Sequence, residues 1–272
     1  MNYRHAFHAG NAADCLKHAL AVLLLRALQR KPAPVLVLDT HAGAGAYDLA
    51  GPEAARTGEW RTGIGRLLDD PPEELADYVG LVRRLGLYPG SPVLLRALLR
   101  PGDRMACCEL HPEEYAALRR RFAGDGQVGV HRRDAWEALG ALLPPPERRA
   151  LVLIDPPYEA TDEFDRLAEG LRRGHARLPS GVFAAWYPIK HRAPVRGFFA
   201  AMQASGIRDI VAAELWLRAP LDPARLNGSG LLVINPPYRF GDQARPILAA
   251  LLDRLGERNQ GEGCAVTRIA DE

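Results

Sequence analysis

Four consecutive residues, Asp155-Pro156-Pro157-Tyr158, carry the clearest chemical signal in the sequence. They follow the apolar run Ala150–Ile154, which reads as a buried strand. Two successive prolines fix the backbone at this point, so the Asp155 side chain and the Pro156 carbonyl are expected to form a rigid pair of hydrogen-bond acceptors. Such a pair suits an exocyclic amine such as adenine N6, on whose ring Tyr158 can stack. A base inside a helix must be flipped out of its stack to reach such a site.

A second tetrapeptide of the same form, Asn235-Pro236-Pro237-Tyr238, follows a later apolar run. Only one of the two can face a given reaction centre. Asp155 ends the fourth strand of an unbroken series and is expected beside the first strand of a doubly wound sheet, whereas Asn235 is expected at the far side. We therefore predict that Asp155 is the reacting group and that the later tetrapeptide is a strand-terminating turn.

A glycine-rich segment, Asp39-Thr40-His41-Ala42-Gly43-Ala44-Gly45, ends the first predicted strand and lets the backbone approach a nucleoside closely. The third glycine of the dinucleotide motif is missing, because Asp48 stands in its place and would repel a pyrophosphate. Glu109 ends the second strand, where an acid commonly binds ribose hydroxyls, and Asp134 ends the third, placed to accept from an adenine amine. These strand-end acids predict a nucleoside cofactor without phosphates, of the S-adenosylmethionine type.

The N-terminal arm holds a second group of polar side chains. Lys17 and His18 begin a predicted helix and are expected to point toward the cofactor pocket, while Tyr3 and His5 are expected to stack on or position the flipped base. Only three of the 35 Lys and Arg residues are lysines. A lysine kept in such a chain suggests that a compact ammonium is needed, which makes Lys17 a candidate functional residue.

A metal site is an alternative reading of the arm, since His5, His8, Cys15 and His18 are of ligand type. His5 and His8 lie outside the predicted helix, and no side chains that would orient them as ligands are evident. We therefore predict no metal site. Basic residues also cluster at 119–121, 132–133, 172–173 and 190–192, and a modest footprint for a polyanion is consistent with them.

Alternating strand and helix patterns position these residues. Apolar runs predict strands over 34–38, 104–108, 128–131, 150–154 and 181–186, separated by helical stripes near a 3.6-residue period. This order predicts an α/β fold with a doubly wound, mostly parallel sheet. Two later runs, 210–217 and 231–234, are expected to close the sheet as a hairpin.

The first strand–helix–strand unit is longer than one crossover needs. Ser91-Pro92 reads as an N-cap followed by proline at the first helical position, so the helix is expected to resume there and run through 93–100. We predict a domain of residues 1–47 and 91–272 and an insertion of residues 48–90 with one polar helix over 72–85. The insertion suits either a substrate-recognition cap or a surface decoration. Before the first strand, Asn11 is expected to cap a helix with Asp14 at its third position.

Composition limits the classes of protein. The 272 residues are 47% hydrophobic and 25% charged, with a net charge of +2, as in ordinary globular proteins. The longest apolar run has seven residues, from Ala19 to Leu25, which is too short for a membrane span. The N-terminus lacks a signal peptide, and the four cysteines show no disulfide framework. A cytoplasmic protein is expected.

The motifs together resemble one family, the bacterial 23S ribosomal RNA adenine-N6 methyltransferases of the ribosomal large-subunit methyltransferase J group. The resemblance covers nearly the whole chain and rests on these segments: Asn2-Tyr-Arg-His-Ala-Phe-His-Ala-Gly-Asn, Ala13-Asp-Cys-Leu-Lys-His, Leu38-Asp-Thr-His-Ala-Gly-Ala-Gly, Tyr88-Pro-Gly-Ser-Pro, Glu109-Leu-His-Pro, Asp155-Pro-Pro-Tyr-Glu and Trp186-Tyr-Pro. It implies a monomeric class I (Rossmann-like) methyltransferase with a small helical insertion, which uses S-adenosylmethionine to methylate one adenine of the large-subunit RNA.

The resemblance also implies roles for individual residues. The cofactor site would be lined by Lys17, His18, His41, Gly43, Ser91, Glu109, Asp134 and Asp155. Asp155 would be catalytic, with Pro156 and Tyr158 beside it and Tyr3 and His5 near the target base. Two other readings stay open: a DNA adenine-N6 methyltransferase using the same pocket, and a non-catalytic module that binds nucleotides or RNA.

Overall fold

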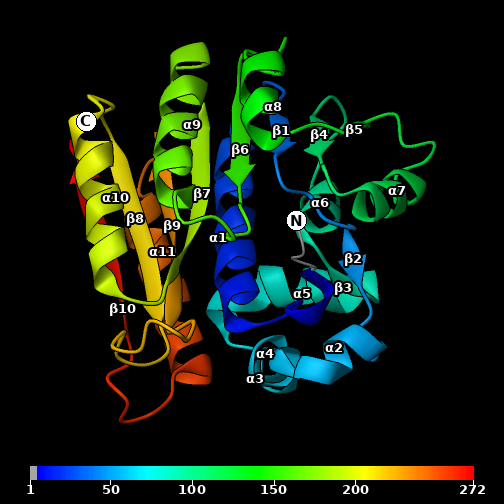
Figure 1. Ribbon diagram of the computed structural model, residues 1–272. Helices are drawn as coiled ribbons and strands as arrows, with labels where there is room; N and C mark the ends of the chain where they lie inside the picture. Colours follow the sequence, from blue (N-terminus) through cyan, green and yellow to red (C-terminus); the bar gives the residue numbers. More distant parts are fainter. Residues whose placement is uncertain (1–4) are drawn as a thin grey trace.

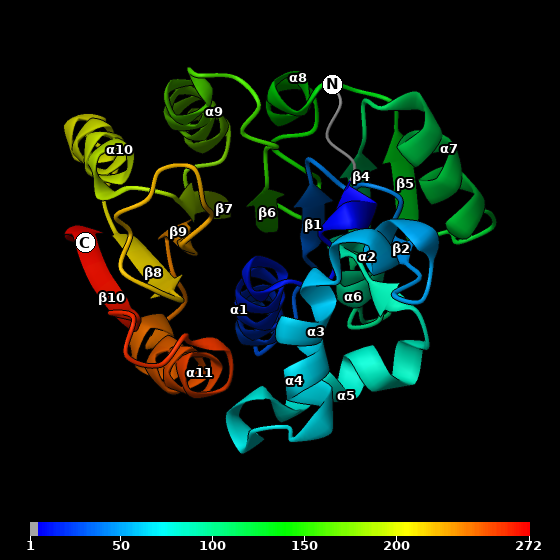
Figure 2. The ribbon, with the colours of Figure 1, turned by 60° about the horizontal axis from the view of Figure 1, so that its bottom comes forward.

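The computed structural model describes residues 5–272, and its centre is one eight-stranded sheet in the order β10-β8-β9-β7-β6-β1-β4-β5 (Figures 1 and 2). The strands are β1 (Leu36–Asp39), β4 (Arg104–Cys108), β5 (Val128–His131), β6 (Ala150–Ile154), β7 (Val182–Ile189), β8 (Ile210–Trp216), β9 (Gly228–Ile234) and β10 (Gly263–Ala270). The short strands β2 (Ala46–Tyr47) and β3 (Tyr88–Pro89) pair separately. The five predicted strands of the parallel block are confirmed.

The sheet changes direction at β7. Strands β5, β4, β1, β6 and β7 are parallel neighbours, whereas β9 pairs antiparallel with both β7 and β8. The predicted hairpin of β8 and β9 is therefore confirmed, with β9 inserted between its partner and β7. Strand β10 was not predicted, and it pairs antiparallel with β8 at the edge. Its residues are mostly half-buried or exposed, so its sequence lacks the apolar run that marks the inner strands.

Helices cover both faces of the sheet, as a doubly wound fold requires (Figure 2). One face packs against α1 (Ala12–Leu28), α6 (Ser91–Arg96), α7 (Pro112–Arg121) and α11 (Phe240–Leu255). The other packs against α8 (Ala135–Ala141), α9 (Glu163–Arg177) and α10 (Arg192–Ala204). Within the described residues, no helix has the length and apolarity needed to cross a bilayer.

Helix α1 follows the short 3-10 helix η1 (His5–Phe7) and begins as predicted. The Oδ1 atom of Asn11 accepts the backbone N–H of Asp14 at 3.0 Å. Leu16, Leu20 and Leu24 are fully buried, because α1 packs across the sheet and against α11. The helix thereby brings its first two turns, which hold Asp14 and Lys17, to the end of the sheet.

The segment of residues 48–90 contains more helix than predicted. It comprises α2 (Pro52–Thr57), α3 (Glu59–Thr62), α4 (Ile64–Asp69), η2 (Glu73–Leu75) and α5 (Ala76–Leu85). The single helix predicted over 72–85 is wrong at its start, which is a 3-10 turn. Gly58 adopts φ 64° and separates α2 from α3. The pairing of β2 with β3 brings the two ends of the segment together.

The prediction of Ser91 as an N-cap is wrong by one residue. Gly90 occupies the N-cap of α6, and Ser91 is the first helical residue. The Ser91 hydroxyl donates instead to Oδ2 of Asp39 at 2.6 Å. A hydrogen bond to an ionised carboxylate is stronger than one between two neutral groups. Helix α6 also ends at Arg96, shorter than the predicted 93–100.

Candidate functional site

A first cavity of about 200 Å³ lies at the carboxyl ends of the parallel strands. Parallel strands end at one edge of a sheet, so residues far apart in the sequence meet there. The cavity is lined by all eight residues predicted to hold the cofactor: Lys17, His18, His41, Gly43, Ser91, Glu109, Asp134 and Asp155. The structure thus brings these predicted residues into one site.

Glu109 anchors the glycine-rich loop. Its Oε2 accepts the backbone N–H of Gly43 at 2.8 Å, and its Oε1 accepts that of His111 at 2.7 Å. Gly43 has φ 59°, and a Cβ at this position would collide with the Tyr47 hydroxyl. The loop therefore needs glycine here, and the Glu109 carboxylate is held with its remaining lone pairs available to a ligand.

Asp39 does not line this cavity but binds Ser91, which does, and this contact was not predicted from the sequence. It is fully buried, and burial raises the pKa of Asp39 to about 6, although the Ser91 hydroxyl and the positive charge of Lys17 act in the opposite direction. An acid that closes a buried strand beside a glycine loop was the available signal. The hydrogen bond from Ser91 positions this serine against the first cavity.

His41 and Asp134 each hold a backbone group as well as lining the cavity. The Oδ1 of Asp134 accepts the N–H groups of Trp136 and Glu137 at 2.9 and 3.2 Å and so caps α8. The Nδ1 of His41 accepts the N–H of Asp155 at 3.3 Å. Burial lowers the pKa of His41 to about 4, which keeps the imidazole neutral and able to accept at physiological pH.

His18 has an unusual environment. It is fully buried, and burial lowers its pKa to about 3. Its Nδ1 lies 3.1 Å from the Tyr88 hydroxyl, while its Nε2 has no hydrogen-bond partner among residues 5–272. A buried polar atom without a partner is costly and often marks a ligand site. Because His18 lines the first cavity, this nitrogen is a candidate contact for the cofactor.

A second, larger cavity of about 690 Å³ adjoins the first. Its lining includes Pro156 and Tyr158, which the first cavity lacks. Both cavities are lined by His5, Lys17, Asp155 and Pro157. The Asp155 side chain therefore stands where a ligand in one cavity can meet a ligand in the other.

A buried ion-pair network holds Asp155 in this position. The Nζ of Lys17 lies 2.5 Å from Oδ2 of Asp155 and 2.9 Å from Oδ1 of Asp14. Oδ2 of Asp14 also accepts the N–H of Gly10 at 3.0 Å and lies 2.8 Å from Nε2 of His5. Burial alone would lower the pKa of Lys17, but the carboxylates of Asp14 and Asp155 raise it well above its ordinary value, so the ammonium stays charged.

Asp14 was predicted only as a capping residue. Burial alone would raise its pKa, but His5, Lys17 and His18 together lower it well below its ordinary value. Its spacing of three residues from Lys17 on α1 was the signal that could have linked them, since residues i and i+3 share a helix face.

Tyr158 and His5, which were predicted beside the target base, both line the second cavity and pack edge-on against other aromatic rings. Tyr158 lines the second cavity, but its hydroxyl donates to the carbonyl of Trp186 at 3.1 Å and its ring packs edge-on against Phe164 and Trp186. His5 lines both cavities and packs edge-on against Tyr47, with ring centroids 5.1 Å apart. Tyr3 lies outside the described residues.

The competing Asn235 tetrapeptide lies at the opposite edge of the sheet. Strand β9 is antiparallel to β7, so Ile234 pairs with Phe183 near the start of β7. The Nδ2 of Asn235 donates to the carbonyls of Pro179 and Gly181 at 2.7 and 2.8 Å. Asn235 lines neither cavity, and its side chain closes a turn as predicted.

Comparison with known proteins identifies the family. A family model described as "Ribosomal RNA large subunit methyltransferase D, RlmJ" matches residues 32–267. The chain belongs to this family. It is 41% identical over 263 residues to "Ribosomal RNA large subunit methyltransferase J" of Escherichia coli (strain K12), covering 94% of each chain. The protein of the same name from Haemophilus influenzae is 41% identical over 270 residues, covering 96% of each. The predicted family and enzyme class, a ribosomal RNA methyltransferase, are confirmed.

Solved structures agree with this placement. A crystal structure of a Legionella pneumophila protein has a TM-score of 0.87 at 32% identity, covering 96% of this chain and 98% of the other. A probable spermidine synthase from Corynebacterium glutamicum has a TM-score of 0.51 at 15% identity, covering 93% of this chain and 74% of the other, and it supports the fold alone. The predicted class I methyltransferase-like fold is confirmed.

The first cavity fits the donor that a methyltransferase of this family needs. Six carboxylates line it against three lysine or arginine side chains, an arrangement suited to a cation and to hydroxyl groups but not to phosphates. The unpartnered Nε2 of His18 adds a polar contact. Within residues 5–272, no three His, Cys, Asp or Glu side chains are grouped as metal ligands.

Proposed function

We propose that this protein transfers a methyl group from S-adenosylmethionine to the exocyclic N6 of one specific adenine in 23S ribosomal RNA. The observation that carries the proposal is the position of Asp155, whose side chain lines both cavities. Membership of the RlmJ family supports the reaction class, and the names of the two bacterial relatives support the choice of large-subunit RNA.

The first cavity is the proposed site of S-adenosylmethionine. Glu109 would accept from ribose hydroxyls, Asp134 from the adenine amine of the cofactor, and Gly43 would allow close approach of the backbone. His18 and Ser91 would supply further polar contacts. When bound, S-adenosylmethionine would supply an electrophilic methyl group: the bond from nitrogen to methyl forms as the bond from methyl to sulfur breaks, which leaves a neutral thioether. The methylated nitrogen then releases one proton to solvent.

The second cavity is the proposed site of the target adenine, flipped out of its RNA stack. The Asp155 carboxylate and the Pro156 carbonyl would accept the two hydrogens of the amine, and so concentrate its lone pair on nitrogen. Holding the amine in a reactive orientation lowers the barrier by positioning alone. Tyr158 would border the base, and Tyr3 and His5 would complete its pocket from the N-terminal arm.

Lys17 has a proposed electrostatic role. Its ammonium, 2.5 Å from Oδ2 of Asp155, fixes the orientation of that side chain. The other oxygen, Oδ1, would remain to accept a hydrogen bond from the target amine.

The decisive experiment measures transfer of a radiolabelled methyl group to unmodified 23S RNA and maps the product. We expect N6-methyladenine at one position with the parent protein and no transfer with Asp155→Ala, while the affinity for S-adenosylmethionine stays near that of the parent. Asn235→Ala is the matched control and should retain appreciable activity, because Asn235 lies at the opposite edge of the sheet.

Other outcomes would contradict the proposal in distinct ways. Transfer to duplex DNA that RNA does not compete away would indicate a DNA adenine-N6 methyltransferase. Binding of cofactor and RNA without transfer by the parent would indicate a non-catalytic module. Loss of activity only in Asn235→Ala would reverse the assignment of Asp155.

The proposal includes the setting in which the protein works. We propose that the protein acts on its RNA in the cytoplasm and as a monomer. We further propose that residues 48–90 form a separate helical insertion subdomain, whose Glu59 and Arg66 contribute to the wall of the second cavity.

A further inference from the structure

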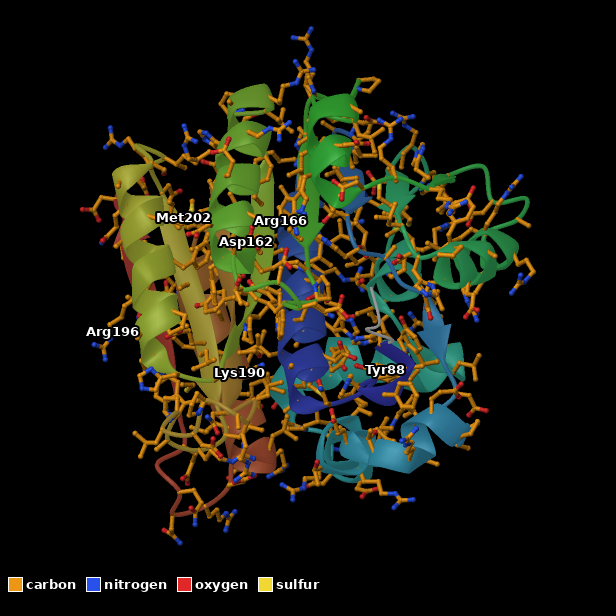
Figure 3. The ribbon with its side chains drawn as sticks, viewed as in Figure 1. Tyr88, Asp162, Arg166, Lys190, Arg196 and Met202 are labelled. Atoms are coloured by element: carbon orange, nitrogen blue, oxygen red, sulfur yellow. The ribbon has the colours of Figure 1, made fainter. Side chains whose placement is uncertain are left out.

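The second cavity changes in charge from its interior to its rim. Asp14, Lys17 and Asp155 lie in its buried part, at the start of α1 and the end of β6, while Lys190 and Arg225 line the cavity from the end of β7 and from the loop between β8 and β9. Both of these basic side chains belong to exposed residues. Figure 3 labels Lys190 at the lower end of β7, at the same end of the molecule as the insertion.

Lys190 and Arg225 are basic residues of this lining, and the charge of Arg225 acts on Glu257 across the cavity. In the part of the chain that the structure describes, neither forms an ion pair within 4.0 Å, whereas Arg218 on the same wall is paired with Glu257. Exposed cations without partners cost little in an isolated protein but attract anions strongly. Both are therefore candidates to bind an anionic ligand.

A buried asparagine holds these two cations in place. Asn227 is fully buried, and its Nδ2 donates to the carbonyls of Lys190 and Asp222 at 2.7 and 2.8 Å. Its backbone N–H donates to the carbonyl of Ile189 at 3.0 Å. The loop of residues 217–227 is thereby fastened to the end of β7, so Lys190 and Arg225 are presented together at one rim.

The size of the cavity indicates more than a single base. Its volume of about 690 Å³ falls within the range of roughly 300–1,000 Å³ that holds an extended small-molecule ligand. A nucleotide segment has the matching polarity, with a neutral base that carries an amine on one side and anionic phosphodiesters on the other. The acidic interior suits the amine, and the cationic rim suits the phosphates.

We propose that Lys190 and Arg225 bind the phosphates of the nucleotides that flank the flipped adenine. This inference rests on the proposed function and adds to it the direction in which the RNA leaves the site, across the end of β7 and the β8–β9 loop. It also distinguishes the basic cluster at 190–192 from two other basic clusters found in the sequence. Residues 119–121 and 172–173 line neither cavity, and Arg172 is paired with Glu169.

The test compares the salt dependence of RNA binding. A fluorescent fragment of 23S RNA that contains the methylated adenine is titrated with the parent, with the double variant K190Q/R225Q, and with the control R173Q, which removes an exposed charge on α9. Each phosphate contact with single-stranded RNA contributes about 0.7 to the slope of log K against log salt, so the double variant should lose about 1.4. Its KM for RNA should rise at least about fivefold, with kcat and cofactor affinity retained.

The outcomes are distinguishable. A smaller slope and a higher KM in K190Q/R225Q alone support the inference. A double variant that keeps the slope and KM of a parent that methylates RNA overturns it, and so does an equal loss in R173Q, which would indicate unspecific attraction. A parent that neither binds nor methylates the RNA overturns the proposed function, and the inference with it.

Discussion

The Nζ atom of Lys17 lies 2.5 Å from Oδ2 of Asp155. The same ammonium is 2.9 Å from Oδ1 of Asp14, so two carboxylates share one positive charge beside the reaction centre. The pair formed with Asp155 uses Oδ2, which leaves Oδ1 for the target amine. Asp14 shares the ammonium, so Lys17 keeps a buried counter-charge when its contact with Asp155 loosens.

We therefore expect Asp14→Asn to lower kcat at least about tenfold, since the neutral amide leaves Lys17 held by Asp155 alone. The amide oxygen can still accept the N–H of Gly10, which preserves part of the local structure. Steady-state kinetics with RNA would measure the loss. The dissociation constant for S-adenosylmethionine should stay near that of the parent.

A double-mutant cycle with Lys17→Met separates this role from a structural one. Lys17→Met alone leaves the buried Asp14 carboxylate without its ammonium and should lower the free energy of unfolding by about 3–5 kcal/mol. Adding Asp14→Asn to it should restore stability and cost little further activity. Losses of activity that simply add in the double variant would show that Asp14 does not act through Lys17.

The sequence predicted this fold well where strands are buried on both faces. The predicted bounds 104–108, 128–131 and 150–154 match the observed strands, because apolar runs end where burial ends. β10 escaped prediction for the same reason, since Thr267 and Arg268 are exposed at the edge of the sheet. The short helices α2, α3 and α4 are also too brief to show a period.

The functional site was likewise predicted only in part. Residues at strand ends were predicted together, because topology alone brings them to one edge. The contact between Lys17 and Asp155 joins positions 138 residues apart and depends on how α1 packs on the sheet, which no local pattern encodes. Ser91 was predicted as an N-cap because serine is favoured at that position and a proline follows it, but its hydroxyl donates to the buried Asp39 instead.

The pair of His8 and Glu59 predicts a pH-dependent attachment of the arm to the insertion. Nδ1 of His8 lies 2.9 Å from Oε1 of Glu59, whose other oxygen accepts from Asn11 at 3.0 Å. The hydrogen bond to Glu59 raises the pKa of His8 above 6.5. Burial would raise the pKa of Glu59, but His8 and Asn11 lower it below 4.5. The stabilisation is then complete between pH 4.5 and 6.5, and is lost as the pH rises through the pKa of His8 or falls through that of Glu59.

Thermal unfolding of Glu59→Gln at several pH values measures this effect. The difference in Tm from the parent should be largest near pH 6 and shrink toward pH 8, where His8 is neutral. Glu74→Gln, which removes an exposed carboxylate of η2, is the control and should show no such trend. A Tm difference for Glu59→Gln that is constant from pH 6 to 8 would count against the attachment.

The raised pKa of Asp39 predicts that the free energy of unfolding falls as the pH rises. Its pKa is raised to about 6, so its contribution to stability is present at low pH and is lost as the pH rises from 3.8 through 6. Asp39→Asn stays neutral throughout. Its free energy of unfolding should therefore gain on that of the parent by about 3 kcal/mol between pH 4 and pH 7, as urea titrations would measure. A constant difference across this range would show that Asp39 ionises normally.

Lys17→Arg tests whether the site needs a compact ammonium. The Lys17 side chain is 6% exposed, and its ammonium lies between Asp14 and Asp155. A guanidinium in the same place would bind the Asp155 carboxylate with two parallel hydrogen bonds and would occupy both of its oxygens. We expect kcat to fall at least about tenfold although the charge is conserved. Lys31→Arg, at an exposed position beyond the end of α1, is the matched control and should behave as the parent. Equal kcat for Lys17→Arg and the parent would show that only the positive charge matters, and that Asp155 meets the amine without giving up its partner.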